Sequence, residues 1–182
     1  KLKKVLEALD ANWQAEMQGY HTYQTLADRD TDPVRSQVLR HLAQAELEHA
    51  ALWESRIEEL GGPKPHYTGG PGGEADKLAN RAGGTKMALR RLEVEESRDI
   101  ARYGMQLKEL GDDGSVAILE HVIEDEREHH LELGSLLRGH YLAPAGAPKV
   151  DPKAVLEEML AKRNAGRKQP GAWIGDAIYG VN

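Results

Sequence analysis

The stretch AELEHA, residues 45–50, places Glu46 and His49 three positions apart. Residues with this spacing lie on the same face of an α-helix. The surrounding sequence, from 34 to 60, contains neither proline nor glycine and repeats its apolar residues at helical spacing. It therefore predicts a long amphipathic helix with two polar side chains in the middle of its core-facing stripe. Such a pair is either an ordinary surface pair or half of a metal site.

The composition limits the kinds of site that the chain can build. It has 182 residues, a net charge of -6, 40% hydrophobic and 30% charged residues, and no cysteine. Disulfides, zinc–thiolate sites, iron–sulfur clusters and cysteine nucleophiles are therefore excluded, and any metal must be held by His, Asp and Glu. No basic face is evident, which argues against nucleic acid as a partner. No run of apolar residues is long enough to span a membrane.

Proline and glycine divide the chain into four long stretches with helical periodicity: 3–29, 34–60, 85–110 and 115–139. The first two and the last two are joined by short turns, while the Gly- and Pro-rich segment 61–84 predicts a long irregular connection. Two helical hairpins joined by one long crossover predict an all-α fold, a ferritin-like four-helix bundle. A generic bundle with a disordered middle loop has the same helix count. We expect residues 1–140 to form the bundle, and 141–182 to form a linker, a short helix near 152–164 and a tail.

Each predicted helix carries an inward stripe that is apolar or aromatic at both ends and acidic in the middle. The polar residues of the four stripes are Glu16, Glu46, His49, Glu96, Glu126 and His129. Buried carboxylates are costly unless they are paired or bound to metal. Two divalent cations would balance four glutamates, and two imidazoles would complete the coordination. Carboxylate and imidazole donors suit iron or manganese.

An internal repeat supports this interpretation more strongly than one Glu-x-x-His pair could. A shift of 80 residues superimposes Glu16, Tyr23, Leu39, His41, Glu46, Glu48 and His49 on identical residues without a gap. The repeated unit is one helical hairpin, and two copies would build a symmetric two-metal site. The competing hypothesis is a solvated acidic face with two stray histidines.

One glutamate on each of two helices and Glu-x-x-His on the other two resemble the ligand set of the di-iron ferritin-like proteins. The stretch LEVEESRDIARY, residues 92–103, adds Glu93 one turn before Glu96. Rubrerythrins carry two glutamates one turn apart on this helix, so the chain is similar to them. The repeat favours Glu96 as the constant ligand, which leaves Glu93 as an extra ligand or a plain surface residue. Asp99 is a further candidate.

The repeat also places two tyrosines at equivalent positions, and their role has two interpretations. Tyr23 and Tyr103 could donate hydrogen bonds to ligand carboxylates, or they could serve packing alone. Within the resemblance, Glu46 and Glu126 are the expected bridging ligands.

The end of the chain carries a second resemblance. DAIYGVN, residues 176–182, is similar to the opening of the first transmembrane helix of the vacuolar-iron-transporter family. Four basic residues precede it and suit a cytoplasmic juxtamembrane segment: Lys162, Arg163, Arg167 and Lys168. Together the two resemblances point to the membrane-bound ferritin group, in which a cytoplasmic di-iron domain is fused to an iron-transporter membrane domain. They imply that this chain is itself soluble and lies at the cytoplasmic face of a membrane.

The resemblance implies two Fe ions per site, with Mn possible, and oxidation of Fe(II) by O2 or hydrogen peroxide. The attached transporter implies a role in iron export and peroxide resistance. A homodimer is also implied, in which the 61–84 crossover could allow hairpins to be exchanged. Two alternatives stay open: a non-enzymatic iron-sensing or delivery module that gates the transporter, and a free-standing peroxide-scavenging enzyme with an external reductant.

Overall fold

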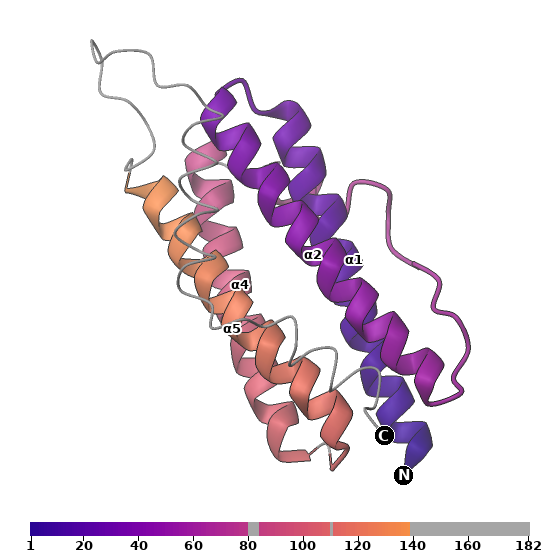
Figure 1. The fold of residues 1–182 in the computed structure, drawn as a ribbon. Helices are drawn as coiled ribbons and strands as arrows, with labels where there is room; N and C mark the ends of the chain where they lie inside the picture. The colour runs from indigo at the N-terminus through magenta and orange to yellow at the C-terminus, as the bar shows by residue number, and fades with distance from the viewer. Residues whose placement is uncertain (80–83, 110, 139–182) are drawn as a thin grey trace.

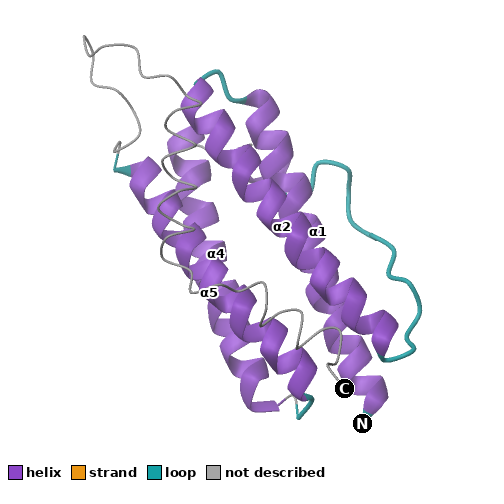
Figure 2. Cartoon of the chain, viewed as in Figure 1, coloured by secondary structure: helices purple, strands orange, loops and turns teal. Residues whose placement is uncertain are grey.

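A computed structural model of the protein describes residues 1–79, 84–109 and 111–138. Its elements are all helices: α1 (Leu2–Arg29), α2 (Pro33–Glu59), α3 (Ala75–Ala79), α4 (Gly84–Glu109) and α5 (Asp113–Leu137). The hairpin of α1 and α2 lies beside the hairpin of α4 and α5, and α2 packs against α5 (Figures 1 and 2). The predicted all-α bundle of two helical hairpins is therefore confirmed.

The second helix of each hairpin begins at an aspartate. Asp32 precedes α2, and its Oδ1 accepts a hydrogen bond from the backbone N–H of Arg35 at 2.9 Å. Asp112 precedes α5, and its Oδ2 accepts from the backbone N–H of Ser115 at 3.0 Å. A side-chain acceptor at this position satisfies one of the unpaired N–H groups of the first helical turn. The two caps stand 80 residues apart, so the internal repeat extends to the helix starts.

The crossover differs from the prediction, because the segment expected to be irregular contains α3. Ala75 and Leu78 are buried in the contact of this short helix with α1 and α4. Arg91 of α4 donates a hydrogen bond from Nη1 to the backbone carbonyl of Leu78 at 2.9 Å. Five residues among many glycines give almost no periodic signal, so the helix depends on these tertiary contacts.

Two apolar clusters fill the bundle, one on each side of a polar layer. One cluster includes Tyr23, Leu39, Leu42, Leu89, Leu92, Leu133 and Leu136. The other includes Leu9, Trp13, Trp53, Tyr103, Leu119 and Val122. Between them lie buried polar side chains: Glu16, Glu46, His49, Asp125, Glu126 and His129. This is the arrangement that the sequence stripes predict.

Among the residues that the structure describes, no helix combines the length and apolar character needed to cross a membrane. The helix expected near 152–164 and the juxtamembrane tail fall in 139–182, outside the described ranges.

Candidate metal centre

Four side chains from three helices converge at the middle of the bundle. Glu16 comes from α1, Glu46 and His49 come from α2, and Glu126 comes from α5. Each offers one donor atom, and these atoms all lie within 4.8 Å of one another. All four residues are buried, with at most 5% of any one exposed. The predicted helical stripes therefore bring three carboxylates and an imidazole to one point in a dry environment.

Glu126 lies between the two imidazole rings. Its Oε1 is 3.4 Å from Nδ1 of His49, and its Oε2 is 3.6 Å from Nδ1 of His129. The two rings are stacked with their centroids 5.8 Å apart. Nδ1 of His129 is also 3.4 Å from Oε1 of Glu46, while Nδ1 of His49 is 3.4 Å from Oε2 of Glu16. Each imidazole thus faces one carboxylate of its own and shares Glu126 with the other.

Glu16 is oriented by two donors that lie away from the histidines. Its Oε1 accepts a 2.7 Å hydrogen bond from the hydroxyl of Tyr103 and a 3.3 Å hydrogen bond from Nε1 of Trp53. Its Oε2 is left facing His49. Trp53 lies one turn after His49 on α2, which places the two side chains on the same helical face.

The charges of the cluster shift the pKa values of its members. Burial alone would raise the pKa of Glu16, but the charge of His49 and the contacts with the side chains of Glu46, His49 and Tyr103 lower it to about 2. Burial would lower the pKa of His49, but Glu16 and Glu126 raise it to about 10. Burial and the Glu16 charge raise the pKa of Tyr103 well above its ordinary value. Tyr103 therefore keeps its proton and remains a hydrogen-bond donor to Glu16.

The donor set fits a first-row divalent metal. Among the described side chains, Nδ1 of His49 and Oε2 of Glu126 are buried atoms that lack a hydrogen-bond partner. Buried polar atoms of this kind cost stability unless something satisfies them. An imidazole nitrogen and several carboxylate oxygens are the donors that iron and manganese prefer.

Asp125 is a functional candidate that the sequence analysis misses. Its Oδ2 lies 2.6 Å from Nε2 of His49, on the side of the ring away from the carboxylates. A carboxylate behind a histidine fixes its tautomer and its ring orientation toward a metal. His121 lies on the far side of this aspartate, with its Nε2 3.8 Å from the same Oδ2. The available signal is a break in the repeat, because the position equivalent to Asp125 is Ala45.

Three further candidate ligands belong to α4: Glu93, Asp99 and Glu96. Glu93 is 26% exposed at its side chain, and its Oε1 is 3.9 Å from Nε2 of His130. Asp99 pairs with Arg102 at 3.3 Å. The side chain of Glu96 is outside the described set, although its backbone belongs to α4. Tyr23 is buried in the apolar cluster on the Leu39 side of the polar layer.

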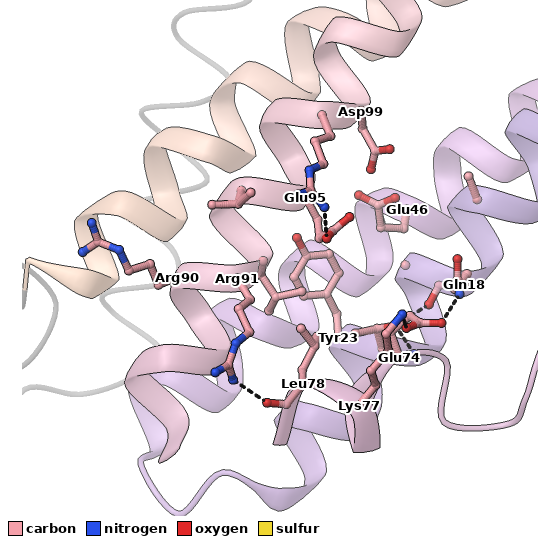
Figure 3. A pocket seen from close by; sticks show the side chains of 16 residues that line it. Gln18, Tyr23, Glu46, Glu74, Lys77, Leu78, Arg90, Arg91, Glu95 and Asp99 are labelled. Atoms are coloured by element: carbon pink, nitrogen blue, oxygen red, sulfur yellow. Dashed lines mark hydrogen bonds and ion pairs between the residues drawn. The ribbon is translucent and has the colours of Figure 1, made fainter. Parts of the chain in front are cut away.

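A pocket of about 520 Å³ lies between α1, α3 and α4. Figure 3 shows Glu46 among its lining side chains, with Glu95 and Asp99 contributed by α4 and Glu74 and Leu78 contributed from the crossover. The pocket therefore reaches the buried cluster from the side opposite α5.

Comparison with known protein families gives an independent result. The family model for rubrerythrin matches residues 7–137. Neither the curated proteins nor the solved structures give a significant match to the chain.

Proposed function

Because the chain belongs to the rubrerythrin family, we propose that the buried cluster binds two Fe(II) ions and supports their oxidation by dioxygen or hydrogen peroxide. The observation that carries the proposal is the position of Glu126 between His49 and His129. A carboxylate with one oxygen toward each imidazole would help to hold a metal ion at each of them, as glutamates do in di-iron helical bundles. The same donors also suit manganese.

The proposed ligands are Glu16, Glu46, His49, Glu126 and His129, which are buried in the polar layer, together with Glu96. Glu96 is supported by helical register, because it lies two turns from both Leu89 and Tyr103, and these are buried on α4. It also stands 80 residues after Glu16 in the repeat. Glu93 stays a predicted extra ligand, with its Oε1 3.9 Å from Nε2 of His130.

Bound iron would supply the redox chemistry, and the side chains would supply charge and position. Three carboxylates within one buried cluster would offset most of the charge of two divalent ions, and Glu96 would add the fourth negative charge that balances it. Asp125 holds His49 in place through Nε2, and Tyr103 and Trp53 hold Glu16 through Oε1. The apolar clusters cover the layer on both sides, while the pocket reaches it at Glu46.

We further propose that this site serves iron export and peroxide resistance at the cytoplasmic face of a membrane, as part of a homodimeric protein that includes an iron transporter. The support is the sequence DAIYGVN at 176–182 and the basic residues that precede it. An iron-sensing or delivery module with the same ligands is the second candidate. A free-standing peroxide-scavenging enzyme is the third.

Anaerobic titration with Fe(II) tests the proposal. We expect two irons per chain, and prompt growth of near-UV ferric absorption after dioxygen or hydrogen peroxide is added. Glu46→Gln and Glu126→Gln each remove one carboxylate charge with little change in shape, so both should lower the iron stoichiometry or affinity. Glu48→Gln is the matched control, because Glu48 lies in the same helical turn of α2 but is exposed.

The outcomes separate the candidates. Iron binding that is unchanged in Glu46→Gln and Glu126→Gln would contradict a site at this cluster. Two tightly bound irons that oxidise slowly would favour the sensing or delivery module. Multiple turnovers with peroxide and an external reductant would favour the scavenging enzyme.

A further inference from the structure

The pocket between α1, α3 and α4 meets the buried cluster at Glu46. Among the described cluster residues, Glu46 alone lines this pocket, and at 5% it is the most exposed of them. Glu16, His49, Glu126 and His129 are each at most 2% exposed. A small molecule that enters this pocket therefore meets the carboxylate of Glu46 first.

Gly19, inside α1, leaves the space in which the Glu46 carboxylate reaches the pocket wall. A Cβ added to Gly19 would lie 2.9 Å from Oε2 of Glu46 and 3.3 Å from its Cδ. Glycine in a helix interior costs about 1 kcal/mol relative to alanine, so its presence needs a local reason. Here the missing side chain leaves room for the Glu46 carboxylate at the pocket wall. Gly19 and Asp99 are equivalent in the repeat, and both line the pocket.

The charges of the pocket balance. Among the residues that the structure describes, four acidic and four basic ones line the pocket. Lys77 pairs with Glu74 at 3.1 Å, and Arg98 pairs with Glu95 at 2.9 Å. Acidic clefts concentrate cations through an unbalanced field, but a balanced lining gives little such attraction. The lining therefore suits an uncharged reactant better than a divalent cation.

We propose that this pocket is the route by which a small uncharged oxidant, dioxygen or hydrogen peroxide, reaches the metal centre beside Glu46. The inference rests on the proposed function and adds the path of the second reactant. The volume of about 520 Å³ is far larger than either molecule, so a large side chain must fill part of the pocket before access becomes slow.

Val94 is the position at which this route can be narrowed without touching the cluster. Its side chain lines the pocket from α4, and the residue is 46% exposed. We would build Val94→Ala, Val94→Phe and Val94→Trp in the full chain. Met105→Trp is the matched control, because Met105 is an exposed apolar residue of α4 that does not line the pocket.

Each variant is first titrated with Fe(II) without oxygen and is then mixed rapidly with dioxygen or with hydrogen peroxide. We expect all variants to bind iron as the unmodified chain does. The oxidation rate should fall as the side chain at 94 grows, by about tenfold for Val94→Trp, because access limits the encounter. Met105→Trp should oxidise at the unmodified rate, and Val94→Ala should be as fast or faster.

Two results would overturn the route. One is an oxidation rate independent of the size of residue 94 for both oxidants. The other is a Val94→Trp chain that loads Fe(II) slowly but oxidises loaded iron normally, which would make the pocket a cation path. If the unmodified chain binds no iron, the proposed function itself fails. That result differs from a failure of the route, because it is seen before any variant is compared. Circular dichroism and thermal melting exclude misfolding as the cause of a slow rate.

Discussion

The hydroxyl of Tyr103 on α4 donates a 2.7 Å hydrogen bond to Oε1 of Glu16 on α1. Both groups are buried, so the bond links the two hairpins inside the bundle rather than at its surface. It also fixes which oxygen of Glu16 is left to face His49. The tyrosine therefore acts on the metal centre through the glutamate that it holds.

Tyr103→Phe should weaken metal binding about tenfold, because Glu16 would keep only the longer bond from Trp53. The free energy of unfolding should fall by about 1 kcal/mol for the lost hydrogen bond. Metal titration and chemical denaturation measure the two effects. Tyr67→Phe is the control, since its hydroxyl bonds a backbone carbonyl at the surface. Equal metal affinity in the two variants would show that the bond serves stability alone.

Asp125→Ala should lower metal affinity by about 10- to 100-fold, since the imidazole of His49 loses the acceptor that orients it. Glu124→Ala changes an exposed neighbour on the same helix and should leave affinity unchanged. Isothermal titration with Fe(II) or Mn(II) distinguishes the variants. An unaltered affinity in Asp125→Ala would mean that packing alone holds the ring.

Gly19→Ala should weaken metal binding and Gly104→Ala should not, although both replace a glycine inside a long helix. A Cβ at Gly104 meets no atom within 4 Å, so this variant should gain about 1 kcal/mol of stability and bind metal normally. A Cβ at Gly19 displaces the carboxylate of Glu46, so metal affinity should fall about tenfold. Thermal melting with and without metal measures both. The contact is unimportant if the two variants behave alike with metal present.

Asp112 should contribute stability that depends on pH. Burial alone would raise its pKa, but hydrogen bonds from Arg56 and Ser115 lower it below the ordinary value of 3.8. A carboxyl with a lowered pKa in the folded state stabilises the fold above the ordinary value. That contribution is lost as the pH falls through the folded-state pKa, so the loss should begin below about pH 4.

The repeat provides a matched comparison for this prediction. Asp112→Ala should cost about 2 kcal/mol at neutral pH, because the helix cap and the two bonds from Arg56 Nη2, at 2.7 and 2.9 Å, are lost together. Asp32→Ala removes the equivalent cap, without that pairing, and should cost about 1 kcal/mol. Denaturation between pH 3 and pH 7 tests both. If the loss of unfolding free energy in Asp112→Ala does not shrink as the pH falls below about 4, the effect is due to packing.

Helical periodicity predicts the features that depend on one helix at a time. The four long helices, the apolar ends of each stripe and the inward position of Glu16, Glu46 and Glu126 all follow from spacing. The repeat adds the pairing of equivalent positions between the hairpins. Spacing and repeat can both be read from the sequence alone, because neither depends on how the helices pack.

The features that sequence misses depend on contacts between helices. Asp125 of α5 contacts His49 of α2, and Trp53 of α2 donates a hydrogen bond to Glu16 of α1. No periodicity encodes those distances. The short helix α3 is stabilised by its neighbours rather than by its own sequence. Gly19 could have been flagged, because glycine is unfavourable inside a helix, but its role is visible only beside Glu46.

The repeat is broken at the residue that meets the outer nitrogen of His49. Nε2 of His49 lies 2.6 Å from Oδ2 of Asp125, and the position equivalent to Asp125 is Ala45. A carboxylate at this nitrogen makes the imidazole a more basic donor, whereas an alanine side chain accepts no hydrogen bond. The two hairpins are therefore not interchangeable around the centre, although they share one repeated unit.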